Sequence, residues 1–498
     1  MRPASALDEH RLRGWLVAAA VTVLAALLRL PGLGRPHRLV FDETYYVKDA
    51  WTLLNLGYEA QWPTEPNPAF EAGDVDSYLT TPSYVVHPQV GKWVIAIGEK
   101  LMGVQDPVGW RISTAVAGIL AVLLLTRIAR RLFRSTALGA LAGVLMAVDG
   151  LAIVHARTGL LDNILMLFVL AAFGALLLDR DRAAARLARA TAPPLSPARF
   201  GPWLGWRPLR LLAGVLLGLG LGTKWSALWF VAAFGLLTVA WDASARYRAG
   251  IVHWWQATLL RDAGPAFVSL VPVAALTYVA GWASWFASSA GYHRQWAAEH
   301  PGEGVTWLPE ALRSWLHYHQ EMWTFHTGLS SSHDYAARAY TWLVQWRPTS
   351  FFYETPEPAQ VACGSDRCSQ AITSLGNPLI WWLGTLAILV ATWWVIRRRD
   401  GVAAVALTGV AAGWLPWLFF PERTIFTFYA IVFLPYLILV LVHVVGRWLE
   451  HPSARRVSVV AGLLVLVLAV SAFFWPVWTA ATVPFRFWQL HMWLPSWV

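Results

Sequence analysis

The sequence is poor in charged residues and in cysteine for its length. Only 14% of its 498 residues are Asp, Glu, Lys or Arg, whereas 57% are hydrophobic. The mean hydropathy is +0.47. A soluble domain of this size needs more polar surface, so the composition predicts a polytopic membrane protein. The 32 tryptophans agree with this class, because indole side chains are enriched at membrane–water interfaces.

The net charge of +10 does not indicate a nucleic-acid partner, because the arginines cluster in short segments between apolar runs. Eleven such runs predict transmembrane helices, near 14–30, 109–126, 136–154, 159–178, 209–223, 226–241, 264–286, 378–396, 402–420, 425–446 and 457–475. Threading them alternately places the arginine-rich segments on one side, at 127–134, 179–210, 245–250, 396–401 and 455–456. By the positive-inside rule that side is cytoplasmic.

The expected fold is therefore an all-α polytopic domain over residues 1–498 in the plasma membrane. The first run ends without a cleavage site, so we expect an uncleaved anchor with a cytoplasmic N-terminus. The outer side then carries two large loops, 31–108 and 287–377, and the C-terminal tail 476–498. Apolar residues at helical spacing predict an interfacial helix in each loop.

Both cysteines, Cys363 and Cys368, fall in the second outer loop. Two thiols cannot form a four-thiolate metal site, but on the outer side they can form a lasting disulfide. Two unpaired thiols are the alternative. His317 and His319, in "HYHQ", fall on different faces of a helix, so their spacing does not indicate zinc. The sequence predicts neither a metal site nor a cofactor.

Charged residues of the first outer loop begin with the pair Asp42 and Glu43 in "FDETYYVKDAW". Taken alone, Asp42 is better explained as an N-cap of the helix that follows, because acids are common at helix starts. Further on, His87 and Lys92 flank a helix start at Pro88, which is a place for a phosphate. Snorkelling of Lys92 along apolar surface is the alternative.

The next outer segments carry more buried charge. Arg111 sits at the outer end of the second span, where a guanidinium matches a phosphate. Asp149, Arg157 and Asp162 interrupt an apolar hairpin. A carboxylate within a span costs about 2.5–3.5 kcal/mol, so Asp162 should be paired and functional. Arg157 is its expected partner, as a structural clasp or as part of the site.

Lys224 and Arg423 also fall at the outer ends of spans, so all of these charges converge on one leaflet. Two carboxylates facing several cations suit a substrate with a phosphate head and a lipid tail. The cations would hold the phosphate as it leaves, and a carboxylate would accept the proton of an attacking hydroxyl. No Gly-rich phosphate loop or soluble nucleotide domain accompanies them, so a nucleotide-sugar donor fits poorly.

Five ordered motifs carry a family resemblance. These are "FDETYYVKDAW", "HPQVGKW", "AVDGLAIVHARTGLLDNILM", "GTKWSALWF" and "MWTFHTGLSSSHDY". Together they closely resemble the protein O-mannosyltransferases in their bacterial, actinobacterial form, over about 38–435. The resemblance implies a GT-C glycosyltransferase that transfers mannose, with inversion, from a polyprenyl phosphate to Ser or Thr hydroxyls of secreted proteins.

The resemblance also assigns roles to residues. It implies that Asp42 is the general base, that Glu43 helps to position the acceptor, and that Arg111 and Lys224 bind the donor phosphate. His87 and Lys92 lie in the family's His-Pro motif, which reads "HPQ" here instead of the commoner "HPP". The second outer loop is too short for the lumenal β-trefoil module of eukaryotic members.

Two other functions remain open from the sequence. A transferase of the same fold could glycosylate a lipid or a cell-wall glycan. A transporter or flippase for lipid-linked sugars would need charges near the membrane midplane and inverted repeats. Neither feature is visible. The expected partners are the polyprenyl-phosphate-mannose donor and an unfolded secretory polypeptide, with the secretion channel as a further candidate.

Overall fold

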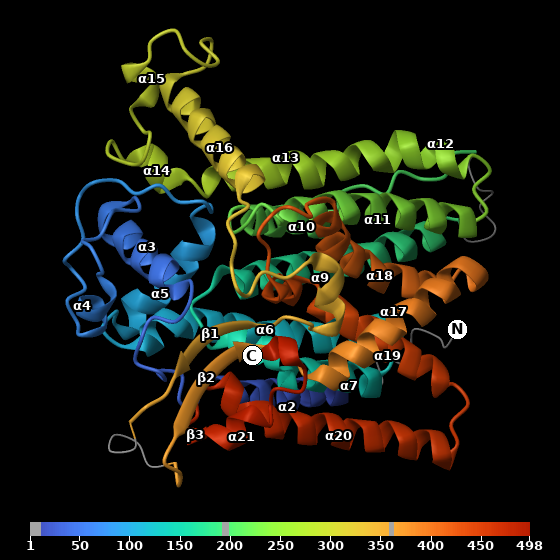
Figure 1. Ribbon diagram of the computed structural model, residues 1–498. Coiled ribbons are helices and arrows are strands. Elements are labelled where there is room, and N and C mark those ends of the chain that lie inside the picture. Colours follow the sequence, from blue (N-terminus) through green and yellow to red (C-terminus); the bar gives the residue numbers. More distant parts are fainter. Residues whose placement is uncertain (1–10, 192–198, 358–362) are drawn as a thin grey trace.

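The computed structural model describes residues 11–191, 199–357 and 363–498. Its helices form an elongated bundle (Figure 1). One end, called the loop-rich end below, consists of α3–α5, α14–α16 and β1–β3, and α12 lies at the opposite end. The first half of the bundle comprises α2 (Arg11–Arg29), α6 (Pro107–Phe133), α7 (Thr136–Val148), α8 (Gly150–Ala156), α9 (Leu161–Ala190), α10 (Pro208–Leu221), α11 (Ala227–Arg248), α12 (Trp254–Thr258), the π-helical turn η1 (Leu259–Ala263) and α13 (Gly264–Ala280).

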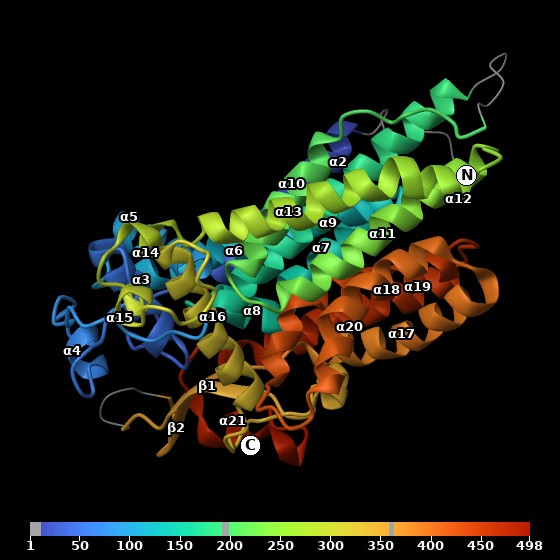
Figure 2. The same cartoon turned by 90° about the horizontal axis from the view of Figure 1, so that it is seen from above.

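The second half of the bundle packs along one side of the first (Figure 2). It comprises α17 (Pro378–Arg398), α18 (Gly401–Trp414), η3 (Leu415–Phe419), η4 (Thr427–Val432), α19 (Leu434–Trp448) and α20 (Ala454–Trp478). α18 contacts α11 and α19 contacts α7, which joins the two halves. α9 and α19 are buried along most of their length and form the centre of the apolar core.

All eleven predicted apolar runs coincide with helices of the bundle. Among the described residues, eight helices are long and apolar enough to cross a membrane, or nine if the bent pair α7 and α8 is one span. α10 and α19 are apolar but shorter. The multi-pass helical class is confirmed, whereas the count of eleven spans is not.

A bend of 62° separates α7 from α8. Asp149 lies at this break and caps α8, with its carboxylate accepting from the amides of Ala152 and Asn377 and from the indole of Trp381. The next residue, Gly150, has no room for a side chain, because a Cβ there would lie 2.0 Å from the ring of Trp478. Asp149 therefore has a structural role at the bend.

The loop-rich end contains the helices expected in the two outer loops. They are α3 (Glu43–Leu56), α4 (Asn67–Glu71), α5 (Val90–Met102), α14 (Ala283–Ala287), α15 (Trp296–Glu299) and α16 (Glu310–Gly328). α5 packs against α3 and α6, so most of it is covered by protein and only its end, at Ile97, Leu101 and Met102, is exposed. α16 projects from the bundle in Figure 1.

A small antiparallel sheet in the order β1-β2-β3 was not predicted from the sequence. It pairs β1 (Thr349–Glu354) with β2 (Cys368–Ser374), and β2 with the short β3 (Val483–Pro484) near α21 (Phe485–Gln489). The sheet therefore ties the C-terminal segment to the second large loop, together with η2 (Ala339–Val344) and the final turn η5 (Pro495–Trp497).

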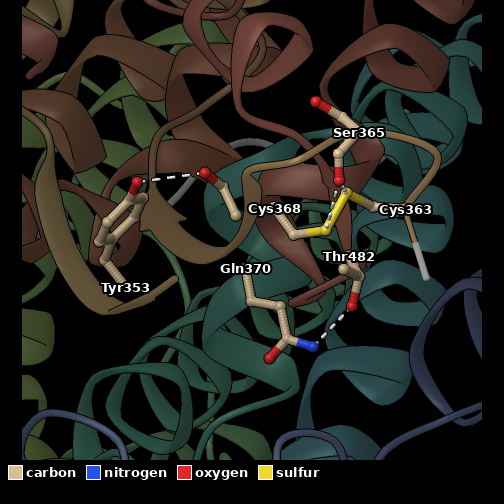
Figure 3. The surroundings of a disulfide bond; sticks show 7 residues. Tyr353, Cys363, Ser365, Cys368, Gln370 and Thr482 are labelled. Carbon is tan, nitrogen blue, oxygen red and sulfur yellow. Dashed lines mark hydrogen bonds between the residues drawn. A yellow bond between two sulfur atoms is a disulfide. The ribbon is translucent and has the colours of Figure 1, made fainter. Parts of the chain in front are cut away.

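The predicted disulfide is present between Cys363 and Cys368, at the start of β2 (Figure 3). Nearby, the side chain of Gln370 donates to the hydroxyl of Thr482, which precedes β3. The disulfide closes a short loop just before β2, the central strand of the sheet.

A candidate active site at the loop-rich end

Asp42 has a carboxylate that is only weakly engaged. It occupies the N-cap position of α3, as the alternative explanation expected, but its side chain makes no capping hydrogen bond. Its described hydrogen bond is a long one, 3.4 Å from the hydroxyl of Tyr46. Phe41, just before it, has a φ of 50°, a strained conformation for a residue with a side chain. This turn leaves the carboxylate available to a substrate.

Glu43 is fully buried and bound on all sides. Its carboxylate accepts from the amides of Val40 and Gly159 and from Nε and Nη2 of Arg111, at 2.7–2.9 Å. The carboxylate therefore has no open position. Glu43 holds the turn before α3 against α6 and the turn before α9, so any effect on the acceptor would act through the position of Asp42.

Arg111 is equally buried, and its five N–H groups all have partners. Besides Glu43, they donate to the carbonyls of Leu33, Pro36 and Arg38 at 2.8–3.2 Å. No donor remains for a phosphate, so the expected direct contact with the donor is contradicted. Arg111 fixes the loop that carries Asp42.

Asp162 and Lys224 form a buried ion pair, with Nζ 2.7 Å from Oδ2. Arg157, the expected partner of Asp162, instead donates to the carbonyls of Arg29, Pro31 and Gly32. The expected Asp162–Arg157 clasp is therefore wrong. Asp162 begins α9 and Lys224 lies between α10 and α11, so only the packing of these helices brings the two charges together.

Lys224 also lies 5.3 Å from the ring centroid of Tyr429, on η4. Its charge acts on Asp42 and favours the ionised carboxylate, whereas Asp162 opposes ionisation. Burial outweighs both and raises the pKa of Asp42 to about 6. A pKa of about 6 leaves most of the Asp42 carboxylate ionised at neutral pH, so it can act as a base there.

Lys92 is not free to bind a phosphate. Its ammonium group is buried and lies 2.7 Å from Glu59 and 3.4 Å from Asp49. Gln89 donates to the other oxygen of Glu59. This cluster joins α3 to α5, so both the phosphate and the snorkelling explanations of Lys92 are wrong.

In contrast to Lys92, His87 lies beside the candidate active site, where its ring stacks on that of His326 of α16 with ring centroids 5.3 Å apart. Its Nδ1 is buried and has no hydrogen-bond partner in the part of the chain that the structure describes, and burial lowers its pKa well below the usual value. His87 is therefore neutral and can serve as a donor or acceptor to a bound molecule.

Arg423 is held by His326. Its guanidinium donates to the carbonyl of His326 and to Nδ1 of the same residue, while Nε2 of His326 donates to the carbonyl of Val86. Nη1 of Arg423 is buried and has no hydrogen-bond partner among the described residues. A positioned cation with an open donor is what an anionic ligand requires.

A groove of about 650 Å³ runs between α11 and α18. Its lining is almost wholly apolar: Trp229, Ala232, Ala233, Leu236, Leu237, Ala240, Thr408, Ala411, Ala412, Leu415, Pro416, Phe419 and Phe420. The groove reaches η3, where the guanidinium of Arg423 lies 5.5 Å from the ring of Trp417. Phe420, at the end of the groove, accepts a hydrogen bond from the backbone N–H of Arg423, so the apolar groove ends near Arg423.

The structure brings Asp42, His87, Asp162, Lys224 and Arg423 into one neighbourhood, as their mutual charge effects indicate. It gives Glu43, Arg111, Lys92, Asp149 and Arg157 structural partners instead. Sequence reasoning missed Tyr46, His326 and Tyr429. His326 and Tyr46 lie within motifs that had been noted, but nothing in their spacing identified them.

Two family models match the chain. Residues 19–261 match "Dolichyl-phosphate-mannose-protein mannosyltransferase", and residues 311–497 match "C-terminal four TMM region of protein-O-mannosyltransferase". The chain is 38% identical to a polyprenol-phosphate-mannose–protein mannosyltransferase of Mycobacterium tuberculosis, over 98% of this chain and 92% of that protein. It is 35% identical to the protein of the same name from Corynebacterium glutamicum, over 96% and 92%.

Among solved structures, the chain resembles the protein O-mannosyltransferase Pmt1-Pmt2 complex of S. cerevisiae bound to the sugar donor. The TM-score is 0.75 at 14% sequence identity, covering 100% of this chain and 94% of that chain. At this identity the likeness concerns the fold.

Proposed function

The chain belongs to the dolichyl-phosphate-mannose–protein mannosyltransferase family, and we propose that it transfers mannose from a polyprenyl-phosphate-mannose donor to Ser and Thr hydroxyls of proteins, with Asp42 as the base. The assignment of the base rests on how weakly the carboxylate of Asp42 is bound within the protein. It lacks a capping hydrogen bond, whereas Glu43 beside it is fully bound.

The proposed step is a single displacement. Asp42 accepts the proton of the acceptor hydroxyl while the oxygen of that hydroxyl bonds to C1 of mannose. The bond between C1 and the phosphate oxygen breaks, and its electron pair leaves with the lipid phosphate. Attack opposite the leaving group inverts the configuration at C1. The proton is transferred late, because the alcohol becomes acidic only as the new bond forms.

Lys224 and Arg423 are the proposed ligands of the lipid phosphate. Negative charge accumulates on that phosphate as it leaves, and cations already positioned there stabilise the transition state without reorganisation. The unpartnered Nη1 of Arg423 supports this role. Asp162 would hold Lys224 in place, and His87 supplies a neutral imidazole beside them.

The polyprenyl chain would lie in the groove between α11 and α18. Support comes from its apolar lining, its volume of about 650 Å³ and its approach to Arg423. A lipid there would place its phosphate at the loop-rich end, while the tail remains among membrane-facing side chains such as the exposed Leu236.

We place the loop-rich end on the outer face of the plasma membrane, with the N-terminus cytoplasmic. The arginine-rich segments of the sequence support this orientation by the positive-inside rule. An unfolded secretory polypeptide would then reach Asp42 from outside. Delivery by the secretion channel fits that arrangement and remains part of the proposal.

The test is transfer of radiolabelled mannose from polyprenyl-phosphate-mannose to a peptide rich in Ser, Thr and Pro. Membranes carrying the wild type should label the peptide, and membranes carrying Asp42→Asn should not. Labelling of a cell-wall glycan but not of the peptide would overturn the proposed acceptor. Full activity of Asp42→Asn would overturn the proposed base.

A further inference from the structure

A second group of chemically reactive side chains lies away from the proposed active site, where α15 and the turn before it pack on α16. His317 and Glu321 are one helical turn apart on α16, so they share a face of that helix. His293 approaches them from the turn before α15. Figure 1 shows this part of the chain, α14–α16, projecting beyond the bundle.

We propose that His293, His317 and Glu321 form a binding site for a divalent cation of the zinc class. One nitrogen of each imidazole and one carboxylate oxygen lie within 4.8 Å of one another. Two imidazoles and a carboxylate are a ligand set that suits Zn²⁺, whose bonds to nitrogen and oxygen are about 2.0–2.2 Å.

One ligand–ligand distance is already close to that around a coordinated ion, and the others are at most 4.8 Å. Tetrahedral ligands at such bond lengths are separated by about 3.3 Å. Nε2 of His293 lies 3.1 Å from Oε1 of Glu321, yet the two do not form a hydrogen bond of normal geometry. Small rotations of the side chains would bring the third ligand, from His317, into place.

The backbone at His293 gives independent support. Its φ of 56° is in the left-handed region, which a residue with a side chain adopts at a cost. Such strain is retained where the surrounding structure or a function requires it. Here Nε2 of the imidazole lies 3.1 Å from Glu321, and it is buried with no hydrogen-bond partner within residues 11–191, 199–357 and 363–498.

Neighbouring groups orient the proposed ligands. The ring of His317 stacks on Trp296, with centroids 4.0 Å apart and planes 5° apart, which fixes its plane while leaving its nitrogens at the edge. The hydroxyl of Tyr292 lies against Glu321. Supporting contacts of this kind hold metal ligands in position.

The other nearby histidines are already engaged. His319 bonds to the carbonyl of Trp315 and to the hydroxyl of Tyr278, and Nδ1 of His300 lies 2.9 Å from the carbonyl of Trp296. The two histidines of "HYHQ", His317 and His319, are therefore not the pair to consider as joint metal ligands. The partner of His317 is Glu321, four residues on, together with a histidine from another segment.

An ion at this site would fasten the turn at 290–295 to α16. On another face of the same helix, the hydroxyl of Tyr318 bonds to Val85 and Nε2 of His326 bonds to the carbonyl of Val86. The site would therefore stabilise the helix that carries His326, which in turn holds Arg423. The ion takes no part in the transfer step.

The experiment uses the full-length protein in nanodiscs, purified without a histidine tag and treated with a chelator. Zn²⁺ is then titrated against a chromophoric competitor, and Co²⁺ is used as a spectroscopic probe. We expect one equivalent of tightly bound Zn²⁺ and the intense visible absorption of tetrahedral Co²⁺. Absence of saturable binding by the wild type would overturn the proposal, and this result requires no variant.

Variants then locate the site. His293→Gln and Glu321→Gln should weaken Zn²⁺ binding by at least about 100-fold, and the Co²⁺ absorption should disappear. His300→Gln is the matched control, because His300 stacks on the same Trp296 without belonging to the set. Equal binding by Glu321→Gln and His300→Gln would overturn the assignment.

Discussion

Two neighbouring carboxylates, Asp42 and Glu43, should respond in opposite ways to the loss of their charge. We predict that Asp42→Asn abolishes transfer without lowering stability, whereas Glu43→Gln lowers stability. The two side chains differ by one position in the chain, but one faces the site and the other is buried in a network with Arg111.

The stability effect at Asp42 follows from its pKa of about 6, raised by burial from 3.8. A carboxyl with a raised pKa binds its proton more tightly in the folded state, so its ionisation destabilises the fold. That cost is absent below about pH 4, grows between about pH 4 and 6, and is complete above pH 6. After allowance for solvent screening it amounts to about 1–2 kcal/mol, which Asp42→Asn should recover at neutral pH.

The stability effect at Glu43 has the other sign. Glu43→Gln removes the charge that compensates the fully buried guanidinium of Arg111. Breaking a buried pair on one side costs about 3–5 kcal/mol. Thermal unfolding of the purified variants at pH 7.5 should therefore show an unchanged or higher Tm for Asp42→Asn and a clearly lower Tm for Glu43→Gln.

The activity effect at Asp42 is measured with the mannosyl-transfer assay. Loss of a general base reduces the rate by about 10²–10⁴-fold. In the wild type, a base with a pKa of about 6 is about 9% ionised at pH 5 and about 91% ionised at pH 7, so kcat/KM should rise about tenfold over that range. A flat profile, or a Tm that falls more for Asp42→Asn than for Glu43→Gln, would refute the reasoning.

Three further predictions concern the donor. Arg423→Ala should raise KM for the lipid donor while leaving KM for the peptide unchanged, because Nη1 has no other described partner; equal changes in both would contradict its role. Lys224→Met should abolish transfer and lower the Tm, since Asp162 loses its partner at a cost of about 3–5 kcal/mol, and replacing Asp162 by Asn in the same chain should restore Tm but not activity. Ala233→Trp should obstruct the groove and raise KM for a long-chain donor more than for a short-chain one, whereas Leu386→Trp, on the exposed side of α17, should change neither.

The family resemblance and the multi-pass helical fold were predictable because they depend on local features. Each apolar run is long enough to fold as a helix by itself, and in a membrane its backbone must be satisfied within the segment. The positions of all eleven helical runs therefore followed from hydropathy. Where a run was short, as at α10 and α19, hydropathy did not determine whether it crosses the membrane.

The pairing of charges was decided only by the tertiary structure. The sequence gathered Asp42, Glu43, Arg111, Arg157 and Asp162 at one end of the bundle, but it paired Asp162 with the near residue Arg157. The packing of α9 against α10 instead brings Lys224 to Asp162. The backbone carbonyls at the end of α2 and just after it accept the hydrogen bonds of Arg157.

The same reason explains why His293 and Arg423 acquired partners that no spacing indicated. Their contacts join segments that are distant in the chain, such as Arg423 with His326 and His293 with Glu321. Sequence patterns report which residues share a face of one helix. Which helix faces meet depends on the packing of the whole bundle. Shape complementarity and burial determine which of many electrostatically equivalent pairs of charged side chains forms.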